Sequence, residues 1–491
     1  MKYSIKQFVR ANSQKIYHIE MKKYMKQLFV LCCLLPLLSG CFDFEEVNDN
    51  PNNIKDVDPG GLLGAAIYDG VHRNLYNSHR FGMYLGQQVT NTSLINEIHR
   101  YIISPAESNR IYDYLYRILN DVEDIINNSK ENNYPNYEAA GYVLKAWMFS
   151  ILTDTFGDVP YSEALKGKDK DFMPKFDTQE AIYTDLLKNL DYASTLFDEA
   201  NGFQFGGDYL YNGDVVKWQK FCNSLRIKLL MRCSKRSEIN APERIALIYQ
   251  NEPLFSSYED GAVLHYTGDG AFRNPFTTSN SDNFEARLAA STTFIDVMNY
   301  NLDPRRYAYF TDVSGEFNGL PSGVDPEEVS SHPRLARLRP EFRDPQCKGS
   351  ILTHAELEFF LAEAALKGWI SASAETHYEA GIRSSMKYWG VTDSDTEQFL
   401  LREKVIFDGT LYQIFEQKWI DSYFNGMETW IEYRRNRMPE FNFTGHMGNG
   451  GQTPTRFIYP TYLQSLNADN YEEVVERIGG DNMQTVCWWE K

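Results

Sequence analysis

The feature that most constrains the fold is a series of amphipathic helical patterns that follow one another in pairs. One apolar stripe runs from Ile182 to Phe197 and the next from Trp218 to Cys233, each repeating every three or four residues. Asp177 with Glu180 predicts the start of the first helix, and Asp214 predicts the start of the second. Two helices separated by a short turn form a hairpin, so the sequence predicts a mainly α protein built from hairpins.

Three more pairs show the same pattern. Thr353 with Glu356 predicts a capping box, and Gly368-Trp369 predicts the turn between the two helices of that pair. Alanine, glycine and aromatic residues at these offsets resemble tetratricopeptide hairpins, which gives four tetratricopeptide-like hairpins as the scaffold. The three further pairs are Leu115–Asn127 with Glu138–Thr153, the helix after Thr353 with one containing Ala374, Tyr378 and Ile382, and Leu411–Phe424 with Glu428–Arg435.

Two stretches do not follow the helical pattern. Residues 239–350, rich in Gly, Asn, Pro and aromatic residues, predict an insert of loops, short helices and a few strands. The insert has too many aromatic residues to be disordered. Asn442–Pro460 predicts an ordered loop that packs on the helical body. The fold predicted from the sequence is therefore a helical scaffold with a loop-rich, irregular face; the resemblance described below implies that this face binds the ligand.

The amino-terminal segment resembles the signal of a bacterial lipoprotein. Lys22, Lys23 and Lys26 precede an apolar run, Leu28–Leu38, which is shorter than the roughly 20 residues that a membrane span needs. Small residues and then Cys41 follow, which resembles a lipobox, and this implies that Cys41 carries the lipid. An ordinary signal peptide with a chance cysteine is the alternative.

These features divide the chain into three parts. Residues 1–40 are interpreted as the signal peptide, with Met21 as the expected start. Residues 41–60 are the lipidated cysteine and a polar tether, and 61–491 are a single domain that contains the insert.

The charge of the chain excludes whole classes of partner. Residues 1–40 contain seven basic residues and one acidic residue, so the chain from Cys41 onward has 42 basic and 66 acidic residues and a formal net charge of −24. Nucleic acids need Lys and Arg for phosphate contacts, so we expect no nucleic-acid partner. Anionic lipid is repelled too, so membrane attachment must be covalent. The cysteines have no regular spacing, and no disulfide framework is predicted.

Signatures of catalysis or metal binding are missing from the sequence. There is no His-Glu-x-x-His, Gly-x-Ser-x-Gly or P-loop motif, and His72 and His79 lack an evident third ligand. We therefore predict no enzyme activity, no cofactor and no metal site. Arg434, Arg435 and Arg437 are expected to pair with carboxylates of the chain rather than with an anionic ligand.

Aromatic residues in the loops are the basis for predicting ligand binding. A sugar ring stacks on an aromatic face, and its hydroxyls pair with planar polar groups. The alternative for each residue is packing of its loop on the body. The predicted ligand-binding residues are Tyr76, Tyr84, Asn91 and Tyr101 in the first region, and Tyr266, Phe272, Arg273 and Phe276, with His265 and Asn274 beside them, in the insert.

Several segments resemble the SusD/RagB family of surface glycan-binding lipoproteins of Bacteroidetes, in the branch called SusD-like type 2. They occur in the family's order over nearly the whole chain after Cys41. The turn at Asn436–Pro439 departs from the branch, which has a smaller turn there. The matching segments are Asp43–Asn48, Asn50–Asn52, Thr153–Tyr161, Pro174–Glu180, Lys217–Phe221, Ser224–Arg226, Ser281–Phe284, Glu363–Leu366, Gly368-Trp369, Gln417–Ile420, Tyr433–Arg435 and Trp488-Trp489.

The resemblance implies a mostly helical, non-catalytic protein at the cell surface, anchored by lipid to the outer membrane. Its implied role is to capture an oligosaccharide and deliver it to a SusC-like TonB-dependent transporter, over which it closes as a lid. Peptide capture by the same mechanism is an alternative, and so is a tetratricopeptide scaffold that binds only protein. No motif in the sequence specifies the glycan.

Overall fold

The computed structural model describes residues 58–93, 98–279, 284–443 and 447–491. The signal segment, Cys41 and most of the expected tether lie outside these residues. Residues 58–491 form one compact unit, which begins with helix α3 (Pro59–Asn77). The Asp58 side chain accepts a hydrogen bond from the Gly61 amide and caps this helix, so helix has already begun at the end of the expected tether.

Helices α5 (Pro105–Asn132) and α6 (Pro135–Phe156) form the first predicted hairpin, and both extend beyond their predicted ranges. Each begins with proline, whose missing N–H has no intrahelical partner to lose at that position. Asn133, in the left-handed conformation (φ 58°), ends α5. Gly141 allows close packing, since a Cβ there would lie 2.6 Å from the Ile126 side chain.

The second hairpin consists of α7 (Gln179–Leu196) and α8 (Val215–Arg232). Asp214 caps α8 as predicted. The predicted cap of α7 was wrong by one residue, because Thr178 and not Asp177 accepts the hydrogen bond from the first turn. Asp177 instead accepts hydrogen bonds from two backbone amides of the preceding loop. The helix is therefore capped by the hydroxyl of the next residue, Thr178.

The third hairpin consists of α13 (His354–Leu366) and α14 (Ala374–Tyr388). Thr353 caps α13 through the amide of Glu356, as predicted. The other half of the predicted capping box does not form, because one carboxylate oxygen of Glu356 lies 2.7 Å from Lys228 Nζ. The ion pair draws this carboxylate into the protein interior.

The last hairpin and the insert complete the described chain. The fourth hairpin is α16 (Leu411–Asp421) with α17 (Glu428–Asn436). The insert has short helices and strands, as predicted. Its elements are α9 (Ala241–Asn251), β4 (Ala262–His265), β5 (Leu288–Ala290), α11 (Thr292–Tyr300), α12 (Arg306–Tyr309), β6 (Phe310–Thr311), β7 (Arg337–Leu338) and, at its end, β8 (Lys348–Leu352).

The strands form small sheets and not a central one. One sheet has the order β1-β5-β7-β6, and the pairs β2-β3 and β4-β8 stand alone, all with antiparallel neighbours. The prediction of a mainly α fold is therefore confirmed. The remaining elements are the π-helix Ser78–Gly82, α4 (Met83–Leu85), β1 (Val89–Asn91), β2 (Val159–Pro160), β3 (Phe176–Asp177), α15 (Asp393–Leu400), α18 (Leu463–Leu466) and α19 (Ala468–Ile478), with short 3₁₀ turns between them.

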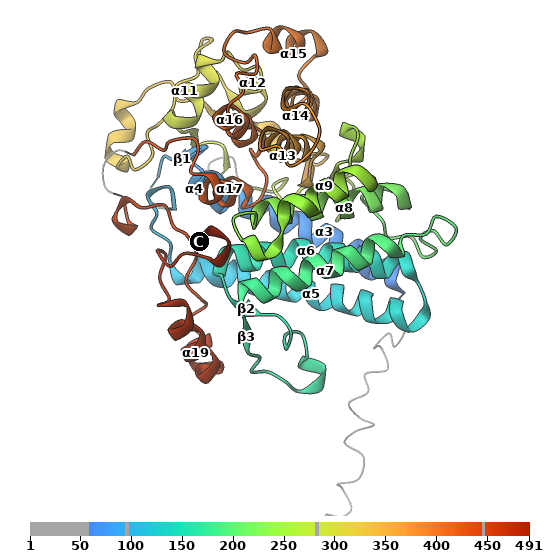
Figure 1. Cartoon of the computed structure of the whole chain (residues 1–491). Coiled ribbons are helices and arrows are strands. Elements are labelled where there is room, and N and C mark those ends of the chain that lie inside the picture. The colour runs from blue at the N-terminus through green and yellow to red at the C-terminus, as the bar shows by residue number, and fades with distance from the viewer. Residues whose placement is uncertain (1–57, 94–97, 280–283, 444–446) are drawn as a thin grey trace, which may run out of the picture. The chain divides into compact units, whose positions relative to one another are not determined.

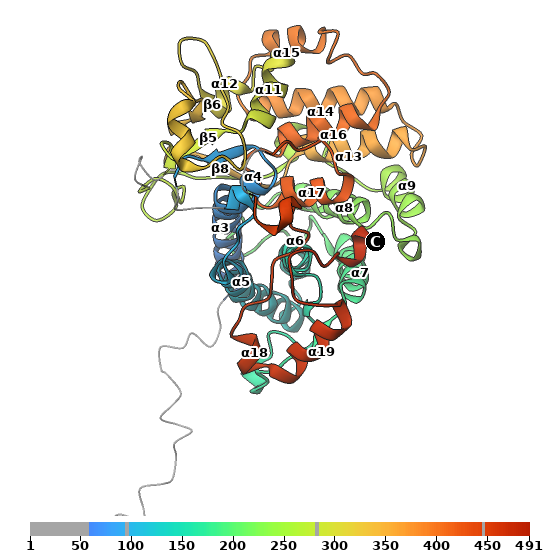
Figure 2. The ribbon, with the colours of Figure 1, turned by 90° about the vertical axis from the view of Figure 1, so that its left-hand side faces the viewer.

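The helices form two groups that lie crosswise. In Figure 1, α5, α6 and α7 run side by side along their length, whereas α13 and α14 are seen nearly end-on. In Figure 2, α13 and α14 are seen along their length, and α6 and α7 are seen nearly end-on. Helix α8 contacts both α6 and α13, and α17 lies beside α16. The two groups therefore meet around α8 and α17. Among the residues described, no helix has the length and apolar character needed to cross a membrane.

Candidate functional site

A buried network of ion pairs lies where the two helix groups meet. Arg232 of α8, only 1% exposed, contacts Asp154 of α6 at 2.5 Å. The same guanidinium contacts Glu428 at 2.5 Å and Glu432 at 3.3 Å, both on α17. One side chain thus connects three helices from distant parts of the sequence.

Neighbouring pairs extend this network to α13 and α16. Lys228 contacts Glu428 at 2.9 Å and Glu356 of α13 at 2.7 Å. Lys418 of α16 contacts Glu432 at 2.8 Å, and Arg435 contacts Glu363 at 2.5 Å. Every group is buried, and a buried charge is tolerated only when it is paired and hydrogen-bonded. We call this set of groups the buried charge network.

The network confirms one expectation and resolves an open question. Arg434 and Arg437 both pair with Glu490, at 2.5 and 3.1 Å, so the arginines of this segment pair internally as predicted. The sequence left open whether Gln417-Lys418-Trp419 serves the scaffold or a partner. All three side chains are buried, which assigns them to the scaffold.

Opposing effects set the pKa values in the network. Burial raises the pKa of Glu356 to about 7, against the pull of Lys228. Burial likewise lowers the pKa of Lys418 to about 8. For Glu432 burial also favours the neutral form, but Arg435, Lys418 and Arg232 outweigh it and hold the pKa well below the usual range. Neighbouring cations therefore keep Glu432 ionised, whereas burial shifts Glu356 and Lys418 toward their neutral forms.

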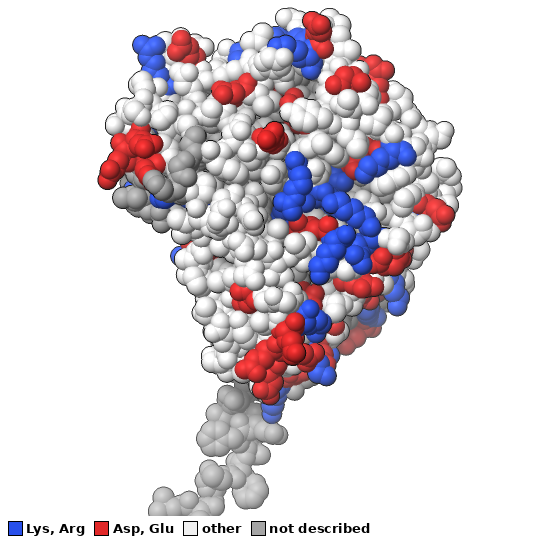
Figure 3. Space-filling view, turned by 60° about the vertical axis from the view of Figure 1, so that its left-hand side comes forward, with Lys and Arg blue, Asp and Glu red and all other residues white. Residues whose placement is uncertain are grey.

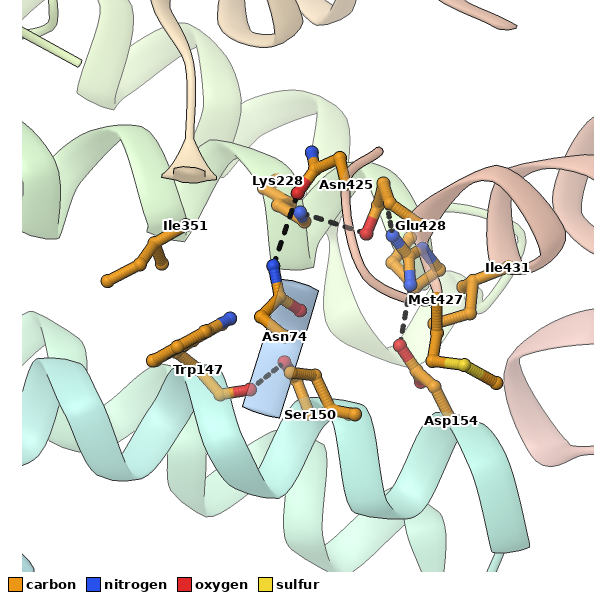
Figure 4. Close-up of a pocket in the computed structure, with 12 residues that line it drawn as sticks. Asn74, Trp147, Ser150, Asp154, Lys228, Ile351, Asn425, Met427, Glu428 and Ile431 are labelled. Atoms are coloured by element: carbon orange, nitrogen blue, oxygen red, sulfur yellow. Dashed lines mark hydrogen bonds and ion pairs between the residues drawn. The ribbon is translucent and has the colours of Figure 1, made fainter. Parts of the chain in front are cut away.

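A small polar cavity adjoins the network, as Figure 4 shows. Lys228, Glu428 and Asp154 line it together with Asn74 and Asn425, whose side chains are 3.4 Å apart. Its volume is about 20 Å³, enough for one water molecule but not for a sugar ring. The cavity belongs to the scaffold, and a ligand must bind elsewhere.

The first region of predicted ligand-binding residues lies mostly inside the protein. Tyr84 and Asn91 are buried and joined by a hydrogen bond from the Asn91 amide to the Tyr84 hydroxyl. Tyr101 is fully buried, with its hydroxyl 3.1 Å from that of Thr453. Tyr76 is half-buried beside the Arg73 guanidinium. Three of these four side chains therefore contact protein on all sides.

In the insert region, Phe272 and Arg273 remain accessible. Tyr266 and Phe276 are buried. Phe272 is half-buried, and its ring centroid lies 5.1 Å from that of Tyr68 and 4.7 Å from that of the exposed Tyr209. The Tyr68 hydroxyl donates to two backbone carbonyls of the 271–273 loop and so pins this loop to α3. His265 is exposed, and the buried Asn274 donates to two loop carbonyls. Whether ligand contacts any of the predicted residues stays a prediction.

A larger cavity lies elsewhere, between α11, α16 and the loop after α17. Its volume is about 370 Å³, which suits a sugar unit. We call it the α11–α16 pocket. It is lined by Thr292, Thr293, Asp296, Val297, Pro321, Tyr412, Pro439, Glu440 and Asn442.

Packing beneath the α11–α16 pocket fixes its walls. Phe294 of α11 meets Trp419 of α16 edge to face, with ring centroids 4.8 Å apart. Phe441 stacks on Tyr433 at 3.7 Å and attaches the 437–443 loop to α17. The Thr293 hydroxyl donates to the Gln87 side chain, which holds the start of α11. The pocket is thus preformed by buried contacts of three elements.

The pocket combines an aromatic ring with oxygen-rich side chains. Tyr412 is 47% exposed, and Asp296, Glu440 and Asn442 are exposed as well. Partial burial raises the pKa of Asp296. Sequence reasoning missed these four residues. Tyr412 lies on the polar face of a helix that was correctly predicted, and only the fold brings the other three next to it.

Comparison with known proteins decides the family. The sequence profile of the SusD-like family, described as starch-binding and associating with the outer membrane, matches residues 51–460. The chain belongs to the SusD-like family. Members of this family are binding proteins. No curated protein matches this SusD-like chain significantly.

Among the described residues, no cluster of three His, Cys, Asp or Glu side chains forms a metal site.

Solved structures share the fold over nearly the whole chain. A chitin-binding protein is 27% identical, with a TM-score of 0.79, over 88% of this chain and 100% of its own. A SusD homologue from Bacteroides fragilis is 25% identical, with a TM-score of 0.78, over 89% of this chain and all of its own. A chitin-binding SusD homologue from Flavobacterium johnsoniae is 22% identical, with a TM-score of 0.76, over 88% and 98% of the two chains.

Removing the central cation of the buried charge network should destabilise the protein strongly. Arg232→Met leaves Asp154, Glu428 and Glu432 without their shared partner, and uncompensated buried charge costs about 3–5 kcal/mol. Urea denaturation at neutral pH measures the loss. The matched control is Arg383→Met, which removes the exposed ion pairs with Glu379 and Glu397 and should cost less than about 1 kcal/mol. Equal losses for the two variants would contradict a structural role of the network.

Proposed function

We propose that this SusD-like protein is a cell-surface lipoprotein that captures an oligosaccharide and delivers it to a partner TonB-dependent transporter in the outer membrane. The α11–α16 pocket is the observation that carries the proposal, because it is a preformed cavity with an aromatic wall and convergent polar groups. Binding involves no bond making or breaking. The lipobox at Cys41 and the family resemblance support the location and the partner.

The chemistry of the α11–α16 pocket suits a carbohydrate. The exposed ring of Tyr412 offers a stacking face for the C–H groups of a pyranose. Asp296, Glu440 and Asn442 supply acceptors for sugar hydroxyls, and Asn442 also supplies a donor. Few of the lining residues have long, flexible apolar side chains. Little side-chain conformational entropy is therefore lost when a sugar ring enters the pocket.

Two further observations bear on ligand choice. Two of the similar structures are named as chitin-binding proteins, so chito-oligosaccharides are the first ligands to test. Phe272 and Arg273, with Tyr209 beside them, are accessible, and we propose them as a second contact region for a longer oligosaccharide. The buried Tyr84, Tyr101, Tyr266 and Phe276 are left out of this proposal.

Removing the aromatic wall should weaken binding. Tyr412→Ala deletes the stacking face, which is worth about 0.5–1.5 kcal/mol beyond buried area, so the dissociation constant should rise about tenfold. Calorimetric titration with chito-oligosaccharides, or with the best glycan from an array, measures the change. The control is Tyr300→Ala on α11, an exposed tyrosine that does not line the pocket and should leave binding unchanged. If Tyr412→Ala binds normally while Phe272→Ala does not, the ligand site lies in the insert region instead.

The proposed lipid anchor can be tested by replacing the sulfur atom of Cys41. Cys41→Ser removes the thiol that would take the lipid, so labelled palmitate should be incorporated into the wild-type protein and not into the variant. The variant should also leave the membrane fraction. A variant that stays labelled, or a wild-type protein that is recovered unlabelled from the cytosol, contradicts lipidation at Cys41.

A further inference from the structure

We infer that the α11–α16 pocket selects positively charged amino sugars, such as glucosamine units that lack the acetyl group, over neutral or acidic sugars. The inference rests on the proposed function, because it assumes that this pocket holds the glycan. It concerns which class of sugar is bound.

The charged side chains that line the pocket are all negative. Asp296 and Glu440 are carboxylates, and among the nine described lining residues there is no Lys, Arg or His. Neither carboxylate forms an ion pair with another described residue. A third carboxylate, Glu416, interacts with the Tyr412 hydroxyl and raises its pKa, after the larger effect of burial. Asp296 and Glu440 thus give the pocket negative charge that no described cation pairs with.

Two of the described cations on neighbouring elements are engaged elsewhere. Lys404 lies over the Tyr300 ring, 3.0 Å from its centroid, and Arg437 pairs with Glu490. On the face shown in Figure 3, several Lys and Arg side chains lie together, bordered by Asp and Glu side chains.

A cationic sugar satisfies this arrangement and an anionic sugar does not. The ammonium group of glucosamine has three donors and a full charge, so it can pair with Asp296 and Glu440 while its ring stacks on Tyr412. A cation over a tyrosine face is also attracted by the ring itself. A uronic acid would bring a further carboxylate into an already negative cavity, and like charges at this range repel.

The decisive experiment compares two oligosaccharides that differ only at one atom of each sugar. The full-chain protein, purified in detergent, is titrated with a β-1,4-linked glucosamine hexamer and with cellohexaose, in a slightly acidic buffer that keeps the amines protonated. We expect the glucosamine hexamer to bind about tenfold more tightly at low salt, with the preference shrinking as salt is added. A hexamer of N-acetylglucosamine tests the effect of the acetyl group separately.

Matched variants separate the pocket from the general negative charge of the protein. In the double variant Asp296→Asn, Glu440→Gln the preference, measured as the ratio of the two dissociation constants, should fall from tenfold to near unity. The control double variant, Glu472→Gln, Glu476→Gln, removes the same charge from exposed positions of α19 and should keep the preference. If both double variants lose it equally, the preference reflects net charge alone and the inference is overturned.

The outcomes also separate this inference from the proposed function. Equal binding of the two hexamers, or tighter binding of a neutral or acetylated one, overturns amino-sugar selection and leaves glycan capture standing. Binding of no glycan of any class overturns the proposed function, and the inference falls with it. Tight binding of the glucosamine hexamer that Tyr412→Ala leaves unchanged places the charge selection outside this pocket and overturns the inference alone.

Discussion

The fold depends on buried ion pairs that join helices far apart in the sequence. Arg232 lies between α6 and α17, and Lys228 lies between α13 and α17, so α8 supplies the cations that hold both helix groups. Such an arrangement is costly to desolvate and stable only when every member is present. Hydrophobic packing alone would bring the two groups together, whereas the ion pairs also fix their relative position.

That fixed position is what makes a preformed pocket possible. Lys418 and Arg435 of the buried charge network lie on α16 and α17, and Tyr412 and the 437–443 loop extend from these same helices. The edge-to-face contact between Phe294 and Trp419 then attaches α11. A pocket whose walls are fixed in this way needs little reorganisation when ligand enters, which suits capture of a nutrient that is present at low concentration.

The sequence predicted the scaffold better than the site, and the reason is physical. Helical periodicity and caps are local, so the four hairpins and the caps Asp214 and Thr353 were predicted correctly. The Asp177 cap failed because its carboxylate was taken by backbone amides of a loop whose position the sequence does not reveal. The internal pairing of Arg434 and Arg435 followed from the acidic composition, although their partners did not.

Aromatic residues in loops were ambiguous for a different reason. The same rings that stack on sugars also fill the interior of a loop-rich insert, and Tyr266 and Phe276 do the latter. Tyr412, by contrast, is a single exposed aromatic residue on a helix, and only its three-dimensional neighbours make it a candidate.

The most direct test is a crystal structure of the protein with a bound chito-oligosaccharide. The account predicts a sugar ring stacked on Tyr412 between α11 and α16. A ligand seated only elsewhere, with the α11–α16 pocket free of sugar, would contradict it.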